Sequence, residues 1–289
     1  MFMLTMKPFL KIKNFLLDIL FPIKCLGCGI ELENEEPEKR WICPECLSKI
    51  KARREQVCPV CEQFSEGGRT HYKCKKETAL DGLWVAAEYK HQAVSEAIHK
   101  FKFNFIKDIS FPLALILIKS VLEAEEYGDF QDIILANFSQ ESFEEEIYIE
   151  KEKNKKAETI IVPVPLHKKR YNWRGFNQAF LLSEHIADKF KLEVYDNFLI
   201  RKKNTKPQTK IKSSKERKEN IRGAFVFEIN NENKNGQAQK IVESDINLKN
   251  KNIILIDDVC TTSATLDECA KELKKAGAKT AWGLVVARR

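Results

Sequence analysis

The chain has 289 residues, of which 43% are hydrophobic and 31% charged, with 49 Lys and Arg against 42 Asp and Glu. This balance is typical of a globular protein of one or two domains and excludes wholesale disorder and fibrous proteins. No apolar run reaches the length of about 18 residues that a membrane span needs, so we expect no such span.

The first 23 residues contain an apolar stretch that charged side chains interrupt. Lys11, Lys13 and Asp18 lie within it, and no small-residue cleavage site follows, so it does not fit a signal peptide. We expect an amphipathic helix over Ile12–Leu20 instead. In the absence of a secretory signal, we predict a reducing, cytoplasmic environment.

Seven of the nine cysteines lie between Cys25 and Cys74. In a reducing compartment, clustered cysteines are more often metal ligands than disulfides. Two residues between paired cysteines let both sulfurs reach one tetrahedral ion, for which zinc is the usual metal. The first four-thiolate set therefore predicts a structural zinc site, with redox cysteines as the alternative; its members are Cys25, Cys28, Cys43 and Cys46.

A second set adds a histidine to three cysteines. It consists of Cys58, Cys61, His71 and Cys74. Both sets supply four protein ligands and leave no open position, so we predict structural rather than catalytic zinc. A segment this short buries little apolar surface, and bound metal would supply the missing stability. His71 is also open to other uses, and we expect Cys260 and Cys269 to be small buried residues.

From about Leu80, apolar strands alternate with helices. We predict strands at 83–87, 159–164, 253–257 and 280–287, and helices at 94–103, 111–122, 175–190 and 265–276. Such a pattern predicts an α/β fold whose mainly parallel sheet has helices on both faces. We divide the chain into residues 1–80, an N-terminal helix and a double zinc-ribbon-like module, and residues 81–289, the α/β domain. Residues 132–157 and 228–250 are polar and predicted to be a loop or insertion and a linker.

A basic segment runs from residue 199 to residue 222 and holds ten Lys and Arg against two Glu. Such a run is usually a solvated face. The alternative is a surface for an anion such as phosphate, nucleic acid or acidic lipid.

The strand at 253–257 leads into the most informative segment. Asp257 and Asp258 stand at its end, and a loop rich in hydroxyl groups then precedes a helix; the loop is Thr261, Thr262, Ser263, Ala264 and Thr265. Ligands of open α/β sheets bind beyond the carboxyl ends of strands, and a helix N-terminus attracts phosphate. We therefore predict a phosphate loop and expect both carboxylates to face the crevice. A capping box of Thr265 and Glu268 is the alternative, but it does not explain the paired acids.

This stretch resembles the phosphoribosyl pyrophosphate (PRPP) motif of type I phosphoribosyltransferases. The resemblance implies that Asp257 and Asp258 are catalytic and hold the ribose hydroxyls. It also implies that the loop holds the 5-phosphate and that Mg²⁺ bridges the pyrophosphate and ribose oxygens. Ser263 replaces the usual glycine of that motif. If this position requires positive φ, serine is strained there.

The resemblance extends upstream to the ComF competence-protein family. It rests on the turn 163–166, on Arg170 and on the run 174–178, and also on Lys102, Phe103, Arg201, Gln208, Arg217, Asn220, Phe225 and the cysteine-rich head. It covers nearly the whole chain from about Phe21 and implies a phosphoribosyltransferase-like domain with a role in DNA uptake. Arg170, Arg174 and Lys102 are then expected to bind pyrophosphate, with both arginines on a closing loop. Arg217 and Asn220 either orient a ligand or fasten the basic segment to the body.

Two functions follow from these patterns. One is an enzyme that transfers a phosphoribosyl group from PRPP to an acceptor that no motif identifies. The other is a DNA-uptake accessory protein that binds PRPP or single-stranded DNA without turnover, alone or with other uptake proteins. The charge of residues 199–222 favours nucleic acid. However, only Phe198 and Phe225 lie beside that segment, which makes a poor stacking platform for single strands.

Overall fold

A computed structural model of the chain describes residues 22–32, 41–123, 130, 133–134, 158–206, 211, 213–228 and 248–289. The helix expected at 12–20 lies outside these residues, as do nearly all of the segment 132–157 and residues 229–247 of the predicted linker.

The body is built on a five-stranded sheet in the order β1-β7-β6-β2-β3, in which every neighbouring pair is parallel. Its strands are β1 (Gly82–Glu88), β2 (Thr159–Pro163), β3 (Glu193–Val194), β6 (Asn252–Cys260) and β7 (Thr280–Arg288). All four predicted strands are present, and β3 adds a short edge. The predicted parallel α/β architecture is confirmed.

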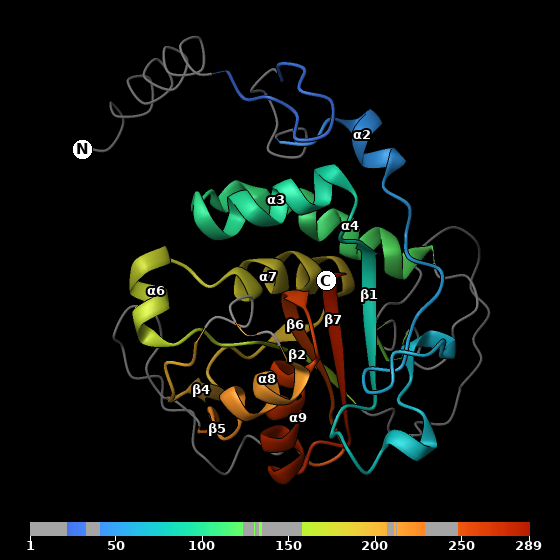
Figure 1. Cartoon of the computed structure of the whole chain (residues 1–289), viewed down its shortest axis with the longest axis vertical. Coiled ribbons are helices and arrows are strands. Elements are labelled where there is room, and N and C mark those ends of the chain that lie inside the picture. The colour runs from blue at the N-terminus through green and yellow to red at the C-terminus, as the bar shows by residue number, and fades with distance from the viewer. Residues whose placement is uncertain are drawn as a thin grey trace, which may run out of the picture.

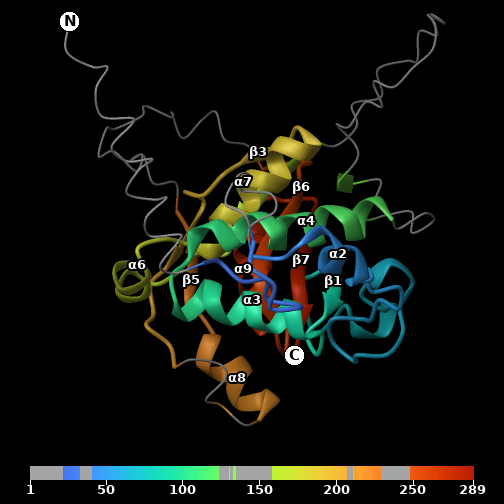
Figure 2. The same ribbon diagram turned by 90° about the horizontal axis from the view of Figure 1, so that it is seen from above.

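Helices cover both faces of the sheet, as predicted (Figures 1 and 2). One face packs against α3 (Gln92–Phe103), α4 (Ser110–Leu122) and α7 (Gln178–Phe190). A 3₁₀ turn at Lys107–Ile109 joins the first two. The other face packs against α9 (Ala264–Lys275) and a two-stranded antiparallel ribbon, β4 (Leu199–Arg201) and β5 (Phe225–Phe227); α8 (Ser214–Ile221) contacts α9.

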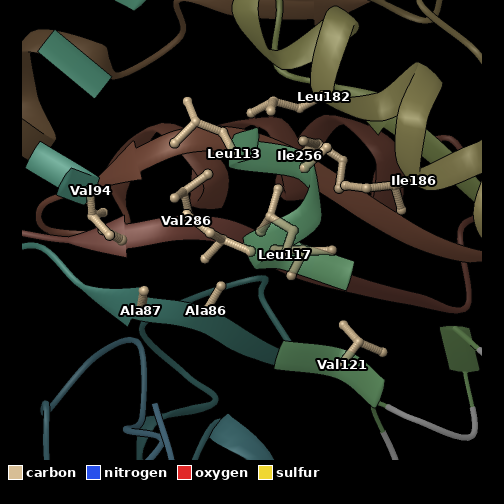
Figure 3. Close-up of a cluster of buried hydrophobic side chains, with 14 of the residues drawn as sticks. Ala86, Ala87, Val94, Leu113, Leu117, Val121, Leu182, Ile186, Ile256 and Val286 are labelled. Atoms are coloured by element: carbon tan, nitrogen blue, oxygen red, sulfur yellow. The ribbon is translucent and has the colours of Figure 1, made fainter. Parts of the chain in front are cut away.

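Alternating residues of β6 supply the two cores. Ile254 and Ile256 lie in the layer under α4 and α7, whereas Ile253 and Leu255 lie in the layer over α9. Figure 3 shows Ile256 and Val286 of the sheet among leucines of α4 and α7. Burying each such side chain contributes about 1.5–3 kcal/mol, which holds β6 in the middle of the sheet.

Two predicted boundaries differ from the structure by three residues. The helix expected from Gly175 starts at Gln178, because Gly175 has φ 76° and ends a separate helix, α6 (Lys168–Arg174), while Asn177 caps α7. Arg170 and Arg174 therefore lie on a helix rather than on the expected loop. The second difference is at the end of a strand, because β6 continues to Cys260 instead of ending at Asp257.

The cysteine-rich module lies against the sheet edge and α3 (Figure 1). Its regular elements are α2 (Pro44–Lys49) and two 3₁₀ turns, Glu66–Gly68 and Tyr72–Cys74. Gln56 is buried and bonds both backbone groups of Val85 in the edge strand β1, accepting from its N–H at 2.9 Å and donating to its carbonyl at 3.0 Å. The module thereby covers an edge that would otherwise be open to pairing. In the described parts of the chain, every helix is too short or too polar to cross a membrane.

Candidate functional site

The first predicted zinc set comes together as expected. The Sγ atoms of Cys25, Cys28, Cys43 and Cys46 all lie within 4.8 Å of one another. Backbone N–H groups face the sulfurs, with Cys43 N–H and Gly27 N–H donating to Cys25 Sγ at 3.3 and 3.4 Å. Burial raises the pKa of the Cys25 thiol, but these backbone bonds outweigh it and lower the pKa to about 6. The set suits tetrahedral zinc.

The second set also converges. The ligand atoms of Cys58, Cys61, His71 and Cys74 lie within 4.8 Å of one another. His71 Nε2 lies 3.0 Å from the carbonyl of Phe64, so a proton on Nε2 leaves Nδ1 free to face the sulfurs, 3.3 Å from Cys61 Sγ. Such an outer bond is how metal-binding histidines are usually oriented. We call residues 22–50 the first knuckle and residues 55–80 the second knuckle.

The two acids lie on β6 where one of its two neighbouring strands has already ended. Pairing of β6 with β2 ends at Ile256, whereas pairing with β7 continues to Cys260. Asp257 and Asp258 therefore stand beyond the end of β2, as the position of a crevice in an open α/β sheet requires.

Asp258 is buried rather than facing the crevice openly, which corrects the expectation for this residue. It is 3% exposed, and its Oδ1 accepts from Lys102 Nζ at 2.9 Å and from the N–H of Val259 at 2.7 Å. Its Oδ2 is buried without a hydrogen-bond partner in the described structure. Lys102, expected to bind pyrophosphate, contacts this acid in the structure.

The pKa of the Asp257 carboxyl is shifted strongly from its ordinary value. Burial, and next the charge of Asp258, raise the pKa of its carboxyl to about 7, against a smaller opposing effect of Lys102. A carboxyl with a strongly raised pKa beside a second carboxylate is typical of functional sites.

The predicted phosphate loop has the strained backbone that the sequence suggested. Ser263 has φ 57° and ψ 0°, a left-handed conformation that glycine adopts readily and serine does not. Thr262 Oγ1 is buried, and the described structure gives it no hydrogen-bond partner. The loop therefore combines a strained residue with an unused hydroxyl, as sites built for a ligand often do.

The capping-box alternative is wrong. The helix α9 begins at Ala264 with Ser263 as its N-cap, so Thr265 lies inside the helix. The carboxylate of Glu268 accepts from the N–H of Gly223 and from Lys271 Nζ, each at 2.8 Å. Glu268 therefore holds the turn after α8 and does not close the start of its own helix.

Three arginines, two from α6 and one from β4, gather beside the acids. Arg170 Nη2 donates to the carbonyl of Thr205 at 2.7 Å, and Arg174 Nη1 donates to Gln178 Oε1 at 2.8 Å. Arg201 of β4 is 8% exposed and donates to Thr205 Oγ1 at 2.6 Å. Arg201 had no predicted role in the site, although it is among the residues of the ComF resemblance. Within the described residues, none of the three forms an ion pair with a carboxylate.

Electrostatics place these cations next to each other and to the acids. Burial, and next the charge of Arg170, lower the pKa of Arg201 to about 10, and Asp257 acts the opposite way. Burial also lowers the pKa of Arg174, whereas Asp258 and Asp257 raise it. Mutually repelling guanidinium groups are stabilised by a shared anion, because each offers a fork for phosphate oxygens.

Unused buried polar atoms gather at the same place. The described structure has eight buried side-chain nitrogen or oxygen atoms without a hydrogen-bond partner, and five belong to this site: Asp258 Oδ2, Thr262 Oγ1, Arg174 Nε, Gln178 Nε2 and Arg201 Nε. Buried polar groups are nearly always satisfied, so this concentration indicates a place for a polar ligand.

Three further polar side chains have structural roles. Asn220 exchanges two hydrogen bonds with the backbone of Lys206, at 3.2 and 3.0 Å, and Arg217 Nε donates to the carbonyl of Ile211 at 3.0 Å. They fasten the basic segment, which is the second of the two alternatives considered. His167 caps α6 by accepting from the N–H of Lys169.

A hollow of about 260 Å³ is lined by residues of α8, α9 and the second knuckle. Of the predicted site residues it contains only Ala264. Three of its charged groups pair with one another, with Lys271 Nζ 2.8 Å from both Asp267 and Glu268. It is separate from the acids and the arginines.

Comparison with known proteins agrees with the two zinc sites, since residues 16–75 match the double zinc ribbon domain. The chain is 26% identical to competence protein F of Haemophilus influenzae over 268 residues, which covers 91% of this chain and 97% of that protein. The chain is similar to the ComF competence proteins. It is also 26% identical to competence protein ComFC of Bacillus subtilis, over 88% of this chain and 89% of that protein. With the DNA utilization protein YhgH of Escherichia coli strain K12 it shares 24% identity over 82% of this chain and 86% of that protein.

Proposed function

We propose that this ComF relative binds PRPP with Mg²⁺ beyond the end of β2 and transfers its phosphoribosyl group to an acceptor during the uptake or use of DNA. The concentration of unsatisfied buried polar atoms around the acids, the loop and the arginines carries the proposal. The names of the relatives, competence and DNA utilization proteins, support the link to DNA. A cytoplasmic location fits such a role.

The residues divide into groups that suit the parts of PRPP. The backbone N–H groups and Thr262 Oγ1 of the loop suit the 5-phosphate, because a helix N-terminus favours an anion. The carboxylates of Asp257 and Asp258 suit the ribose hydroxyls. Arg170, Arg174 and Arg201 suit the pyrophosphate, whose charge exceeds what one cation neutralises.

In the reaction, the bond between ribose C1 and a pyrophosphate oxygen breaks and the acceptor forms a bond to C1. Positive charge develops on the ribose while negative charge develops on the leaving pyrophosphate. The three arginines stabilise the leaving group, and the two carboxylates lie where they stabilise the cationic ribose. Bound Mg²⁺ would neutralise part of the pyrophosphate charge through hard oxygen ligands.

Calorimetry with PRPP and Mg²⁺ tests binding. Each charge-assisted contact contributes about 1.5–3 kcal/mol, so Asp257→Asn with Asp258→Asn should weaken binding by on the order of a hundredfold. Asp188→Asn is the matched control, since Asp188 lies at the exposed end of α7 and contacts only Lys191 at 3.5 Å among the pairs described. Binding by the double variant as tight as the parent's would refute the site. A screen for pyrophosphate release over candidate bases then tests turnover.

A second function, binding of single-stranded DNA, is favoured by a surface that the sequence did not reveal. Phe105 and Trp173 are exposed and meet edge to face with ring centroids 4.8 Å apart, and the guanidinium of Arg174 lies 6.0 Å from the Trp173 ring centre. Exposed Lys168 and Lys169 lie on the same helix as Trp173. Stacking faces beside cations are what single strands need.

Two lysines of the basic segment already have partners within the protein. Lys202 Nζ lies 2.6 Å from Glu228 Oε2, and Lys203 Nζ donates to the carbonyl of Arg222 at 2.9 Å. We therefore place the nucleic-acid contact on α6 rather than on residues 199–222. Trp173→Ala should weaken binding of a labelled oligothymidine by about tenfold, since stacking contributes about 1–3 kcal/mol per base. Tyr72→Ala, at an 89% exposed aromatic of the second knuckle, is the control and should leave binding unchanged.

A further inference from the structure

Two series of contacts lead from the second knuckle toward the predicted phosphate loop, and both end at the strained residue of that loop. They connect parts of the chain that are about 200 residues apart in sequence: Glu62 with Arg288, and Thr78 with Asp267.

The first contact runs through the end of the sheet. Glu62 directly follows the zinc ligand Cys61, and its Oε1 lies 2.6 Å from Nη2 of Arg288, whose side chain is 7% exposed. Arg288 is the register partner of Cys260 in β6, and the N–H of Arg289 donates to the carbonyl of Cys260 at 3.0 Å. Cys260 Sγ lies 3.5 Å from Ser263 Oγ.

The second contact runs through the first turn of α9. Asp267 Oδ1 accepts from Thr78 Oγ1 and from the N–H of Ala79, each at 2.7 Å. The N–H of Asp267 donates to the carbonyl of Ser263 at 2.8 Å. The C-terminal end of the second knuckle is thus bonded to Asp267, which in turn bonds the carbonyl of Ser263.

Ser263 needs such support, because a non-glycine residue in the left-handed region persists only where its surroundings enforce that conformation. We propose that the second knuckle, when it holds zinc, keeps the phosphate loop in its binding conformation through Glu62–Arg288 and Asp267–Thr78. Zinc in this knuckle and phosphate in the loop then favour each other. The part of this inference that concerns phosphate rests on the proposed function.

The first knuckle has different neighbours. Three of its four cysteines belong to the core layer that contains α3 and α4, and Lys119 of α4 donates to the carbonyl of Ile50 at 3.2 Å. The inference therefore concerns one zinc site of the two, which makes it specific enough to test by counting ions.

Zinc retention gives a test that needs no enzymatic turnover. Coupling between two binding sites is reciprocal, so PRPP must raise the affinity of the second knuckle for zinc by the factor by which zinc raises affinity for PRPP. In a titration of the full chain with a coloured zinc chelator, saturating PRPP and Mg²⁺ should shift the release of one ion of two by about fivefold. Identical release curves with and without PRPP, in a protein that calorimetry shows to bind PRPP, would overturn the coupling.

Point variants test the two contacts with zinc in place. Glu62→Gln and Asp267→Asn should each keep two zinc ions, raise amide hydrogen exchange in residues 260–266, and weaken PRPP binding by about fivefold. Glu272→Gln is the matched control, because Glu272 lies on the same α9 and makes a 2.6 Å contact with Lys275 within that helix. Its exchange and affinity should equal the parent's. Where a variant fails to fold, the chelator titration on the unchanged protein decides.

The exchange measurement separates this inference from the proposed function, because it requires no ligand. Faster exchange in Glu62→Gln and Asp267→Asn, in a chain that binds no PRPP, would support the contacts and refute the PRPP site. Unchanged exchange in both variants would refute the contacts, whatever the affinity for PRPP.

Discussion

Lys102 Nζ lies 2.9 Å from Asp258 Oδ1 and joins the end of α3 to the end of β6. The Asp258 side chain is 4% exposed and that of Lys102 is 22% exposed, so the pair lies largely away from water. A lone lysine at the end of a helix also suits the helix dipole, but this ammonium is directed at a carboxylate of the site. Lys102 should therefore affect both the stability of the body and the charge of the site.

Removing this ammonium should destabilise the protein. Breaking a buried pair costs about 3–5 kcal/mol, and because Lys102 is partly exposed we expect about 2 kcal/mol for Lys102→Met. Lys102→Met with Asp258→Asn should recover most of that loss, since no uncompensated charge remains. Urea unfolding of the parent, both single variants and the double variant closes the cycle. Additive losses would show that the two residues do not interact.

Asp257 should make the protein less stable as pH rises. Its native pKa is raised to about 7 by burial and by Asp258, whereas the unfolded carboxyl is already ionised above about pH 5. Between pH 6 and 8 the native state therefore binds more protons than the unfolded state, and the free energy of unfolding falls as pH increases. We expect this group to contribute a loss of about 1 kcal/mol over that range.

Asp257→Asn isolates this effect. The variant shares the histidines and zinc ligands of the parent, so subtracting its unfolding curve from the parent's leaves the contribution of Asp257. The difference between the two should grow from pH 6 to pH 8, with the variant the more stable at pH 8. Parallel pH profiles would contradict the raised pKa.

The sequence predicted the parts of the site that are continuous in the chain. The apolar run before Asp257, the hydroxyl-rich loop and the amphipathic helix after it are local patterns, and the structure places them as expected. Even the strain at Ser263 was foreseeable, because a glycine is usual at that position of the motif that the loop resembles. The paired cysteines are local signals of the same kind.

Contacts between distant segments were not predictable. The burial of Asp258 depends on Lys102, which lies 156 positions earlier, and Arg201 reaches the site only because β4 pairs with β5 over the α9 face. Short elements such as β4 and α6 have too few residues for a clear period, so propensity alone does not reveal them. The exposed Phe105–Trp173 pair likewise requires the tertiary fold.

The zinc content should be two ions per chain in protein purified without chelator. Cys43→Ser should remove one ion, unfold the first knuckle and lower the soluble yield, because metal binding supplies folding free energy in so small a module. Elemental analysis of the parent and the variant gives the count. A parent with no zinc would refute both sites, and a parent with one would refute the site that contains His71.

Thr262→Val should weaken PRPP binding by less than loss of the two acids does. The change removes a hydroxyl that is buried without a partner in the described structure and leaves the backbone N–H groups of the loop in place. One hydrogen bond contributes about 1 kcal/mol, so we expect a loss of about fivefold. The fold should become slightly more stable, since an unsatisfied polar atom disappears. Unchanged affinity would exclude this hydroxyl from the phosphate site.

Ser263→Gly should leave PRPP affinity unchanged or improve it, because glycine adopts the φ of 57° without the strain of a side chain. Ser263→Ala is the matched control: it also lacks the hydroxyl but keeps the Cβ, so the Gly variant should be the more stable of the two by about 1 kcal/mol. Calorimetry and thermal unfolding of both variants separate the loss of strain from the loss of the hydroxyl. Weaker binding by the Gly variant than by the Ala variant would show that backbone strain is not what limits the loop.

If the parent binds no PRPP, binding restored by Ser263→Gly would identify a site that has drifted from an active ancestor. Continued absence of binding would leave DNA uptake without phosphoribosyl transfer as the function that fits.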